Sequence, residues 1–126
     1  MIFGIGVDIV RIERMAAGIQ RFGDRLARRV LTNREFDEYR RRPGSAAFLA
    51  KRFAAKEAVV KALGYGFRNG ITLRQIGINH DDYGKPVLEY YGAARNLKEH
   101  LGIGDSYISL ADEKSYAVAY VVLLKR

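Results

Sequence analysis

The chain lacks cysteine and tryptophan altogether, and it has only two prolines among 126 residues. Without cysteine it has no disulfide framework, no thiol nucleophile and no zinc site with thiolate ligands. No apolar run reaches the roughly 20 residues that a membrane-spanning helix needs. The first residues also lack the basic segment of a secretory signal. We therefore expect a cytoplasmic protein without a membrane partner.

The residues that are present form an ordinary globular composition, 48% hydrophobic and 29% charged. This composition argues against disorder, collagen-like repeats and coiled-coil rods. A chain of 126 residues can bury one modest core and has no room for two. We expect a single domain that spans residues 1–126.

The net charge of +8 is concentrated in two segments. Residues 11–29 hold six arginines against two acids, and residues 51–68 hold five basic residues against one acid, so each segment carries +4. The other residues balance to zero. Two basic patches predict two acidic partners, or one partner with two acidic ends. The alternative is a basic surface that only keeps the protein in solution.

Apolar spacing and turn residues predict the order of the elements. Strands are expected at residues 2–10, 71–78, 86–91, 107–110 and 116–124. Helices are expected from residue 11 onward, from the capping box Thr32–Glu35 to Pro43, from Ser45 to Gly64, and over residues 93–101. This order predicts an α+β fold, with helices packed on a mostly antiparallel sheet.

The long helix of residues 46–63 has two unlike faces. A stripe of large apolar residues predicts the core side, and it contains Leu49, Phe53, Val60 and Leu63. A second face carries alanines, which would let another backbone or a ligand come close, together with Glu57 and Lys61. The Glu57–Lys61 spacing also fits a simple surface pair worth about 0.3 kcal/mol. Lys56 lies in the apolar stripe, where it either extends to the helix edge or reaches an anion.

Asp8 ends a run of apolar residues and glycines that otherwise predicts a buried strand. A carboxylate there is costly unless it is paired or bound to a metal, so an arginine partner and a metal are both open. Gly4 and Gly6 would let another segment approach this strand closely. Mg²⁺ needs only one or two protein carboxylates. Asp8 and Glu57 are the candidate ligands, and Lys61 could neutralise a phosphate.

Two motifs resemble the signatures of a known family. They are GIGVDIV at residues 4–10 and RFAAKEAVVKALG at residues 52–64. They resemble those of the short, single-domain group of 4'-phosphopantetheinyl transferases that modify acyl carrier proteins. Shorter matches include residues 31–32, 84–86 and 116–119, so the resemblance covers nearly the whole chain.

The resemblance implies a fold and an activity. Members of this family move the phosphopantetheine arm of coenzyme A onto a serine of apo acyl carrier protein, in fatty acid biosynthesis, and release adenosine 3',5'-bisphosphate. They have an α+β fold, and they are homotrimers with active sites between subunits. Mg²⁺ is held by the strand aspartate and the helix glutamate, which are Asp8 and Glu57 here.

The chain departs from the family pattern at two positions. Val10 stands where longer relatives carry a further acid, so that only two protein ligands are expected for Mg²⁺. Ala111 stands where many members carry a histidine, whose role therefore does not transfer. The two histidines present, His80 and His100, are expected on the surface.

The resemblance and the charges together imply a role for each site residue. Lys61 would stabilise the leaving phosphate, and either Glu57 or a water molecule held by the metal and the carboxylates would accept the serine proton. Further coenzyme A contacts are expected from Arg52, Lys56, Gly64, Gly66, Lys85 and Pro86. If the first helix is continuous, one stripe on it would dock the acidic carrier protein, formed by Arg14, Arg21, Arg25 and Arg28.

Two other functions remain as alternatives. The first is a small nucleic-acid-binding module, which the basic charge and the eight tyrosines would suit. Asp8 and Glu57 argue against it because carboxylates repel a phosphate backbone, and no nucleic-acid fold signature is present. The second is a catalytically inactive relative, which the intact Asp8, Glu57 and Lys61 disfavour. We therefore expect no nucleic-acid partner.

Overall fold

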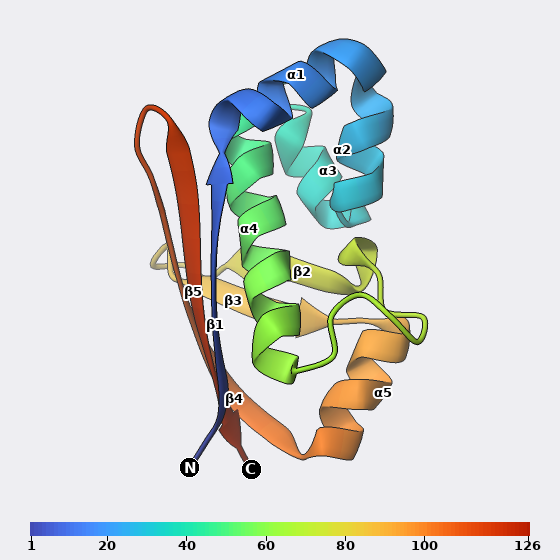
Figure 1. Ribbon diagram of the computed structural model, residues 1–126, viewed down its shortest axis with the longest axis vertical. Coiled ribbons are helices and arrows are strands. Elements are labelled where there is room, and N and C mark those ends of the chain that lie inside the picture. Colours follow the sequence, from blue (N-terminus) through green and yellow to red (C-terminus); the bar gives the residue numbers. More distant parts are fainter.

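A computed structural model describes residues 1–126 and has helices packed on antiparallel sheets (Figure 1). The predicted α+β class is therefore confirmed. The elements in chain order are β1 (Ile2–Arg11), α1 (Ile12–Phe22), α2 (Asp24–Val30), α3 (Asn33–Tyr39), α4 (Ala46–Leu63), the 3-10 helix η1 (Leu73–Gln75), β2 (Ile76–His80), β3 (Pro86–Tyr90), α5 (Gly92–Leu101), β4 (Ile103–Asp112) and β5 (Tyr116–Lys125).

The strands form two sheets, both antiparallel. The larger has the order β1-β5-β4, and the smaller consists of β2 and β3. Helix α4 packs along β1 and β5, while α1, α2 and α3 cover its N-terminal half and α5 lies near its C-terminal end (Figure 1). β1 and β4 are therefore the two edge strands of the larger sheet, with β5 between them.

The contact between α4 and β1 depends on Gly4 and Gly6. A Cβ atom at Gly4 would lie 2.1 Å from the carbonyl oxygen of Ala62, and one at Gly6 would lie 2.0 Å from that of Ala58. Both distances are far below van der Waals contact, so only glycine fits. The predicted close approach at these glycines is confirmed. It holds the next inward residue of β1, Asp8, directly against the helix.

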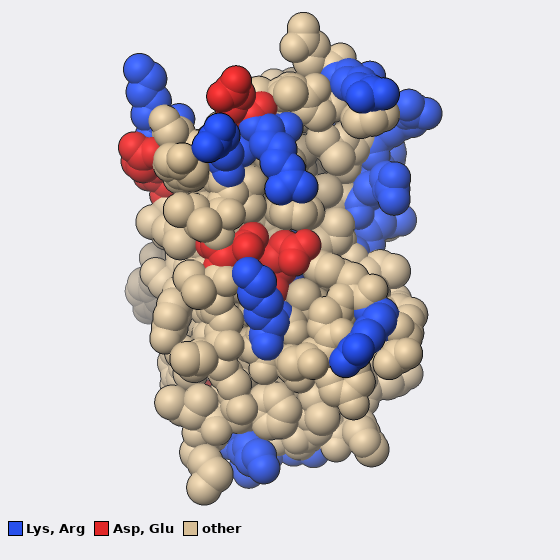
Figure 2. Space-filling view, viewed as in Figure 1, with Lys and Arg blue, Asp and Glu red and all other residues tan.

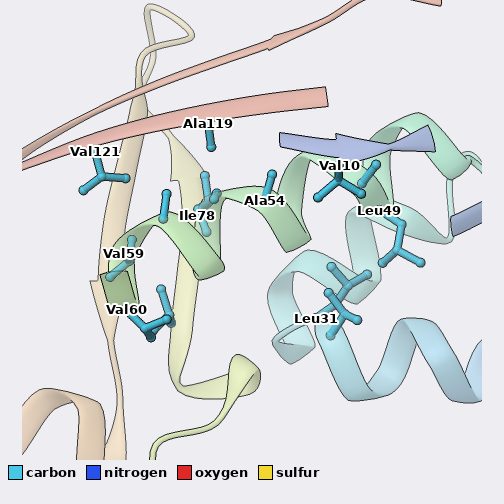
Figure 3. Packing of buried hydrophobic residues seen from close by; sticks show 14 of the residues in the cluster. Val10, Leu31, Leu49, Ala54, Val59, Val60, Ile78, Ala119 and Val121 are labelled. Carbon is cyan, nitrogen blue, oxygen red and sulfur yellow. The ribbon is translucent and has the colours of Figure 1, made fainter. Parts of the chain in front are cut away.

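The core is one cluster of 26 buried residues with α4 at its centre. Figure 3 shows this packing, to which α4 contributes Leu49, Ala54, Val59 and Val60, and other segments contribute Val10, Leu31, Ile78, Ala119 and Val121. The alanine face of α4 is as buried as its large apolar face, because it lies against β1 and β5. Phe53, predicted as core, is only half-buried.

Local signals predicted the ends of several helices correctly. The capping box of Thr32 and Glu35 is formed at α3, and the Ser45 side chain caps α4 by accepting from the Phe48 N–H group. Gly64 ends α4 in the left-handed conformation with φ 84°. These signals succeed because a cap involves only neighbouring residues.

Four predictions about the elements were wrong. α3 ends at Tyr39, before the expected break at Pro43, and β4 begins at Ile103, before the expected residue 107. The first helix is not continuous, because Gly23 adopts φ 60° and separates α1 from α2. The stripe of Arg14, Arg21, Arg25 and Arg28 is therefore divided between two helices and is not one helical face. Residues 71–78 are not all strand either, since η1 occupies Leu73–Gln75 and β2 begins at Ile76.

The larger sheet has an apolar outer face that α4 does not cover. On β1, the side chains of Ile5, Val7 and Ile9 are 57%, 52% and 64% exposed. They pair across the sheet with Val122, Tyr120 and Val118 of β5. Three large apolar side chains at alternating positions of one strand, all more than half exposed, are unusual on a protein surface and mark an interaction face.

None of the helices combines the length and the apolar composition that crossing a bilayer would require.

Candidate functional site

Asp8, Glu57 and Lys61 come together where β1 crosses α4. The Nζ atom of Lys61 lies 3.0 Å from Oδ1 of Asp8 and donates to the carbonyl oxygen of Val7 at 3.1 Å. Glu57 is one helical turn before Lys61 and faces the same strand. Figure 2 shows acidic side chains in one patch near the centre of this face, with basic side chains around it.

The two carboxylates interact unfavourably with each other. Partial burial, together with the negative charge of Asp8, raises the pKa of Glu57, whereas Lys61 and Arg14 act in the opposite direction. The Asp8 side chain is only 16% exposed and that of Lys61 is 52% exposed. The site thus holds two neighbouring carboxylates beside one ammonium group whose side chain is about half exposed.

The donor set of this site suits a hard divalent cation. Carboxylate oxygens are the ligands that Mg²⁺ prefers, and it usually keeps several waters. No group of three or more histidines, cysteines or acids that could hold a metal occurs in the structure. The metal site of Asp8 and Glu57 stays a prediction. Val10, which stands where longer relatives carry a further acid, is a buried core residue with 3% exposure.

Lys56 does not face any phosphate site, so this prediction was wrong. Its side chain is fully buried, and Nζ donates to Oε1 of Glu35 and to the carbonyl oxygen of Val30, both at 2.5 Å. Burial lowers the pKa of Lys56, while the Glu35 carboxylate acts in the opposite direction. Lys56 is a structural residue that ties α4 to α2 and α3.

Glu35 is a residue whose full role the sequence did not indicate. Besides closing the capping box, its carboxylate accepts from the Ile78 N–H group at 2.8 Å and lies 3.5 Å from Nε of Arg52. The sequence feature that could have indicated this role is Lys56, because a lysine within an apolar stripe needs a buried anion as its partner. Spacing alone could not identify Glu35 as that anion.

Arg52, Gly84 and Pro86 meet at a cavity of about 450 Å³. The other residues that line it are Glu38, Arg42, Phe48, Lys51, His80, Ile108, Ser109 and Leu110. The sequence did not indicate Arg42, Lys51 or His80. Lys85 is not among the lining residues, and its Nζ atom lies 5.1 Å from the ring centroid of Tyr107. The cavity combines three basic side chains and one acid, Glu38, with a smaller apolar surface, which suits a phosphorylated nucleoside.

The two histidines lie in different surroundings. His80, at the end of β2, lines the cavity, and both partial burial and the nearby Arg52 lower its pKa. His100 is an exposed residue of the last turn of α5. Both are surface residues as expected, although His80 borders a cavity.

Gly64 and Gly66 form the turn after Lys61. The Gly64 N–H group donates to the carbonyl oxygens of Val60 and Lys61, both at 3.1 Å, and the Gly66 N–H group donates to that of Val60 at 3.5 Å. These amides are already engaged in ending α4. A phosphate contact through them would have to break the helix end.

The four predicted docking arginines lie against aromatic rings. The guanidinium carbons are 4.2 to 6.0 Å from ring centroids, Arg14 over Phe53, Arg21 and Arg25 over Phe22, and Arg28 over Phe36. None of the four forms an ion pair with an acid. Basic side chains gather over α1 and α2 (Figure 2). We call these arginines of α1 and α2 the basic region, and Arg14 within it lies near enough to Glu57 to lower the pKa of that carboxyl.

An apolar hollow lies within this basic region. Its volume is about 590 Å³, and its lining residues are Phe22, Arg25, Leu26, Arg28, Arg29, Val30, Phe53 and Leu73. Phe22 is 44% exposed. Arginines around exposed aromatic and aliphatic side chains are typical of a protein interface.

Comparison with known proteins places these features in a family. Residues 4–121 match the family model described as the 4'-phosphopantetheinyl transferase superfamily. A protein named holo-[acyl-carrier-protein] synthase from Nitrosococcus oceani is 51% identical over 98% of this chain and 80% of its own length. The chain belongs to the 4'-phosphopantetheinyl transferase superfamily.

Solved structures agree in fold over the whole chain. The holo-[acyl-carrier-protein] synthase of Neisseria meningitidis is 42% identical with a TM-score of 0.93, covering 99% of this chain and 100% of that one. The synthase of Bacillus anthracis, solved in complex with coenzyme A (3',5'-ADP), is 34% identical with a TM-score of 0.82, covering 100% and 99%. The chain therefore shares both its fold and more than 30% of its sequence with these two synthases.

Proposed function

We propose that this protein is an Mg²⁺-dependent holo-[acyl-carrier-protein] synthase. It transfers the 4'-phosphopantetheine group of coenzyme A to a serine of apo acyl carrier protein and releases adenosine 3',5'-bisphosphate. The observation that carries the proposal is the meeting of Asp8, Glu57 and Lys61 at the contact of the two signature motifs. Relatives that share nearly the whole chain bear this name.

The reaction is a displacement at the β-phosphorus of coenzyme A. A bond forms between the serine Oγ and phosphorus, and the bond from phosphorus to the bridging oxygen of the pyrophosphate breaks. Glu57 is suited to take the serine proton, because partial burial and Asp8 raise its pKa above that of a free carboxylate. Lys61, with its ammonium group in solvent reach, stabilises the negative charge on the departing phosphate.

Mg²⁺, when held by Asp8 and Glu57, would supply positive charge to the pyrophosphate and offset the charge that develops on its oxygens. Lys61 donates to Asp8 in this structure, and the same ammonium would have to leave Asp8 to reach a phosphate of the ligand. Its half-exposed side chain leaves it free to do so. Asp8 is held rigidly, since Gly6 beside it is locked against α4.

The cavity around Arg52 is the proposed site of the 3'-phosphoadenosine end of coenzyme A. Arg42, Lys51 and Arg52 supply positive charge there, and Pro86 supplies an apolar surface. Lys85 stays a proposed contact at the rim of the ligand site. The turn with Gly64 and Gly66 is proposed to border the pyrophosphate site without donating to the ligand. Its N–H groups already donate to carbonyl oxygens at the end of α4.

We infer that each active site lies between two subunits of a homotrimer. Asp8 is on the edge strand β1, whereas the cavity takes Ile108, Ser109 and Leu110 from the other edge strand, β4. The cavity lining contains none of Asp8, Glu57 and Lys61. A ring in which the apolar outer faces pack would bring β1 of one copy beside β4 of the next. Light scattering at micromolar concentration tests this, and a monomer would contradict it.

The basic region of α1 and α2 is the proposed docking surface for the carrier protein. An acidic partner would be steered by Arg14, Arg21, Arg25 and Arg28. Its apolar side chains would enter the hollow beside Phe22 and Phe53. The divided helix does not weaken this proposal, because both halves border the same hollow.

Further parts of the proposal concern organisation and context. A single domain over residues 1–126 is supported by the one cluster of buried residues. A role in fatty acid biosynthesis follows from the carrier protein as substrate. A cytoplasmic location stays a prediction from composition.

Mass spectrometry of apo acyl carrier protein tests the proposal directly. The carrier protein is incubated with this protein, coenzyme A and Mg²⁺, and should gain one phosphopantetheine. A chelator should stop the gain. No gain, together with a mobility shift of RNA or DNA at physiological salt, would favour the nucleic-acid-binding alternative instead.

A further inference from the structure

One acid lies inside the basic cavity that we assign to coenzyme A. Glu38 lines the cavity, and its Oε2 accepts from Nη2 of Arg52 at 3.2 Å. Its side chain is 37% exposed, whereas that of Arg52 is 3% exposed. The pair therefore joins a fixed guanidinium to a carboxylate that has access to solvent.

The local structure does not favour a carboxylate at this position. Glu38 lies in the last turn of α3, where the helix dipole favours cations, and that turn contains no basic residue. Its favourable partner is Arg52. A glutamate in this place removes positive charge from the cavity when no ligand is bound.

The basic side chains that line the cavity differ in whether they form an ion pair with an acid. Lys51 forms an ion pair with Asp112 at 3.1 Å, outside the lining. Arg42 has no acidic partner, and its guanidinium lies 5.6 Å from the ring centroid of Phe48. Arg52 would keep Glu35 beside its Nε if Glu38 left, so its buried charge would not be left without an anion.

We propose that Glu38 is a specificity-determining residue that occupies the position of a ligand phosphate at Arg52 and is displaced when that phosphate binds. The inference rests on the proposed function, in which the 3'-phosphate of coenzyme A enters this cavity. Glu38 moves outward into solvent, and the terminal phosphomonoester takes its place between Arg42 and Arg52. The same carboxylate then competes with the 3'-phosphate of the product and accelerates its release.

A carboxylate near a phosphate weakens its binding by like-charge repulsion and by competition for the same donor. Glu38→Gln keeps the shape of the side chain and removes the charge. Asp37→Asn is the matched control, because Asp37 is the neighbouring acid of the same helix, is 70% exposed and pairs only with Arg40. Both variants change the net charge equally, so that a general electrostatic effect would appear in both.

The experiment measures binding of adenosine 3',5'-bisphosphate and of adenosine 5'-monophosphate by calorimetry. The full chain is used with Mg²⁺, as wild type, Glu38→Gln and Asp37→Asn. We expect Glu38→Gln to bind the bisphosphate about tenfold more tightly, with the monophosphate changed less than about twofold. Asp37→Asn should leave both unchanged. Inhibition of the transfer reaction by the bisphosphate should strengthen about tenfold in Glu38→Gln alone.

The possible outcomes separate this inference from the proposed function. If wild type and Glu38→Gln prefer the bisphosphate over the monophosphate to the same extent, the proposed role of Glu38 is overturned. The proposed transferase activity would not be affected by that result. Weaker bisphosphate binding by Glu38→Gln would mean that Glu38 holds Arg52 in position, which also overturns the inference. Equal wild-type binding of both nucleotides would overturn the inference together with the cavity assignment. Failure of phosphopantetheine transfer would be seen independently by mass spectrometry.

Discussion

Lys61 and Asp8 are 53 residues apart in the chain, and their side chains meet at 3.0 Å. The contact exists because Gly4 and Gly6 let β1 lie directly on the alanine face of α4. In this arrangement the lysine ammonium partly offsets two carboxylates that repel each other.

Replacing Asp8 or Glu57 by alanine should nearly abolish phosphopantetheine transfer. We expect a loss of about 100-fold or more, because only two protein carboxylates are available to hold the cation. Raising the Mg²⁺ concentration should restore little. The rate of carrier-protein modification is measured by mass spectrometry, with Glu13→Ala on α1 as the control acid. Near wild-type turnover of either variant would remove the metal assignment.

Lys61→Ala should lower kcat by about 100-fold and change the KM for carrier protein little. The reason is that Lys61 contacts Asp8 at the proposed reaction centre and does not line the hollow of the basic region. Steady-state kinetics with varied carrier protein distinguish the two effects. A change in KM alone would assign Lys61 to docking.

Glu57→Gln should raise the stability of the metal-free protein at neutral pH. The pKa of Glu57 is raised in the folded state, so the folded protein binds more protons than the unfolded chain, and stability falls as pH rises through this window. Below the pKa of the unfolded chain, wild type and variant should be equally stable. We expect a rise in Tm on the order of 2 °C at pH 7, since solvent screens a partly exposed group. Thermal unfolding in chelator from pH 4 to 8 measures it, and a lower Tm for the variant at pH 7 would contradict it.

Gly6→Ala should destabilise the fold by about 3 kcal/mol or more. The new Cβ atom would meet the backbone oxygen of Ala58, which cannot move without displacing α4 or β1. Gly104→Ala is the control, because a Cβ atom there would lie 3.0 Å from the Arg126 side chain and no closer than 3.3 Å to any backbone atom. Urea unfolding compares the two, and equal midpoints would show that α4 can shift away from β1.

Lys56→Met should cost about 3–5 kcal/mol of unfolding free energy, because it leaves the buried Glu35 carboxylate without its ammonium partner. Adding Glu35→Gln to this variant should recover part of the loss. Lys98→Met on α5 should cost less than about 1 kcal/mol, since its ion pair is at the surface. Coenzyme A affinity should survive in the folded fraction of Lys56→Met, and its specific loss would return Lys56 to the ligand site.

Reversing Arg14 and Arg21 to glutamate should raise the KM for apo carrier protein about tenfold or more and change coenzyme A binding much less. Salt should weaken the wild type more than the variant, as the Debye length falls from about 10 Å at 0.1 M to about 3 Å at 1 M. The double reversal of Arg95 and Lys98 on α5 is the charge-matched control. Equal KM values and salt slopes in all three proteins would mean that the arginines form only a solvated surface.

Features set by neighbouring residues were predictable from the sequence. The caps at Thr32 and Ser45 and the end of α4 at Gly64 depend on side chains and φ angles within a few residues. The break at Gly23 was missed although it is also local, because the apolar spacing of α1 continues toward α2 and masks a single glycine.

The sequence by itself determined the two motifs, the candidate carboxylates Asp8 and Glu57, and the order of most elements. Only the tertiary structure decided which basic residues face solvent. Lys56 and Arg52 are one turn apart on α4, and both carry a charge that burial disfavours. Lys56 pairs with the Glu35 carboxylate of α3 inside the core, whereas the Arg52 side chain lines the cavity beside Pro86. Periodicity places a side chain on a face of its helix, but the chain that packs on that face determines what the side chain meets.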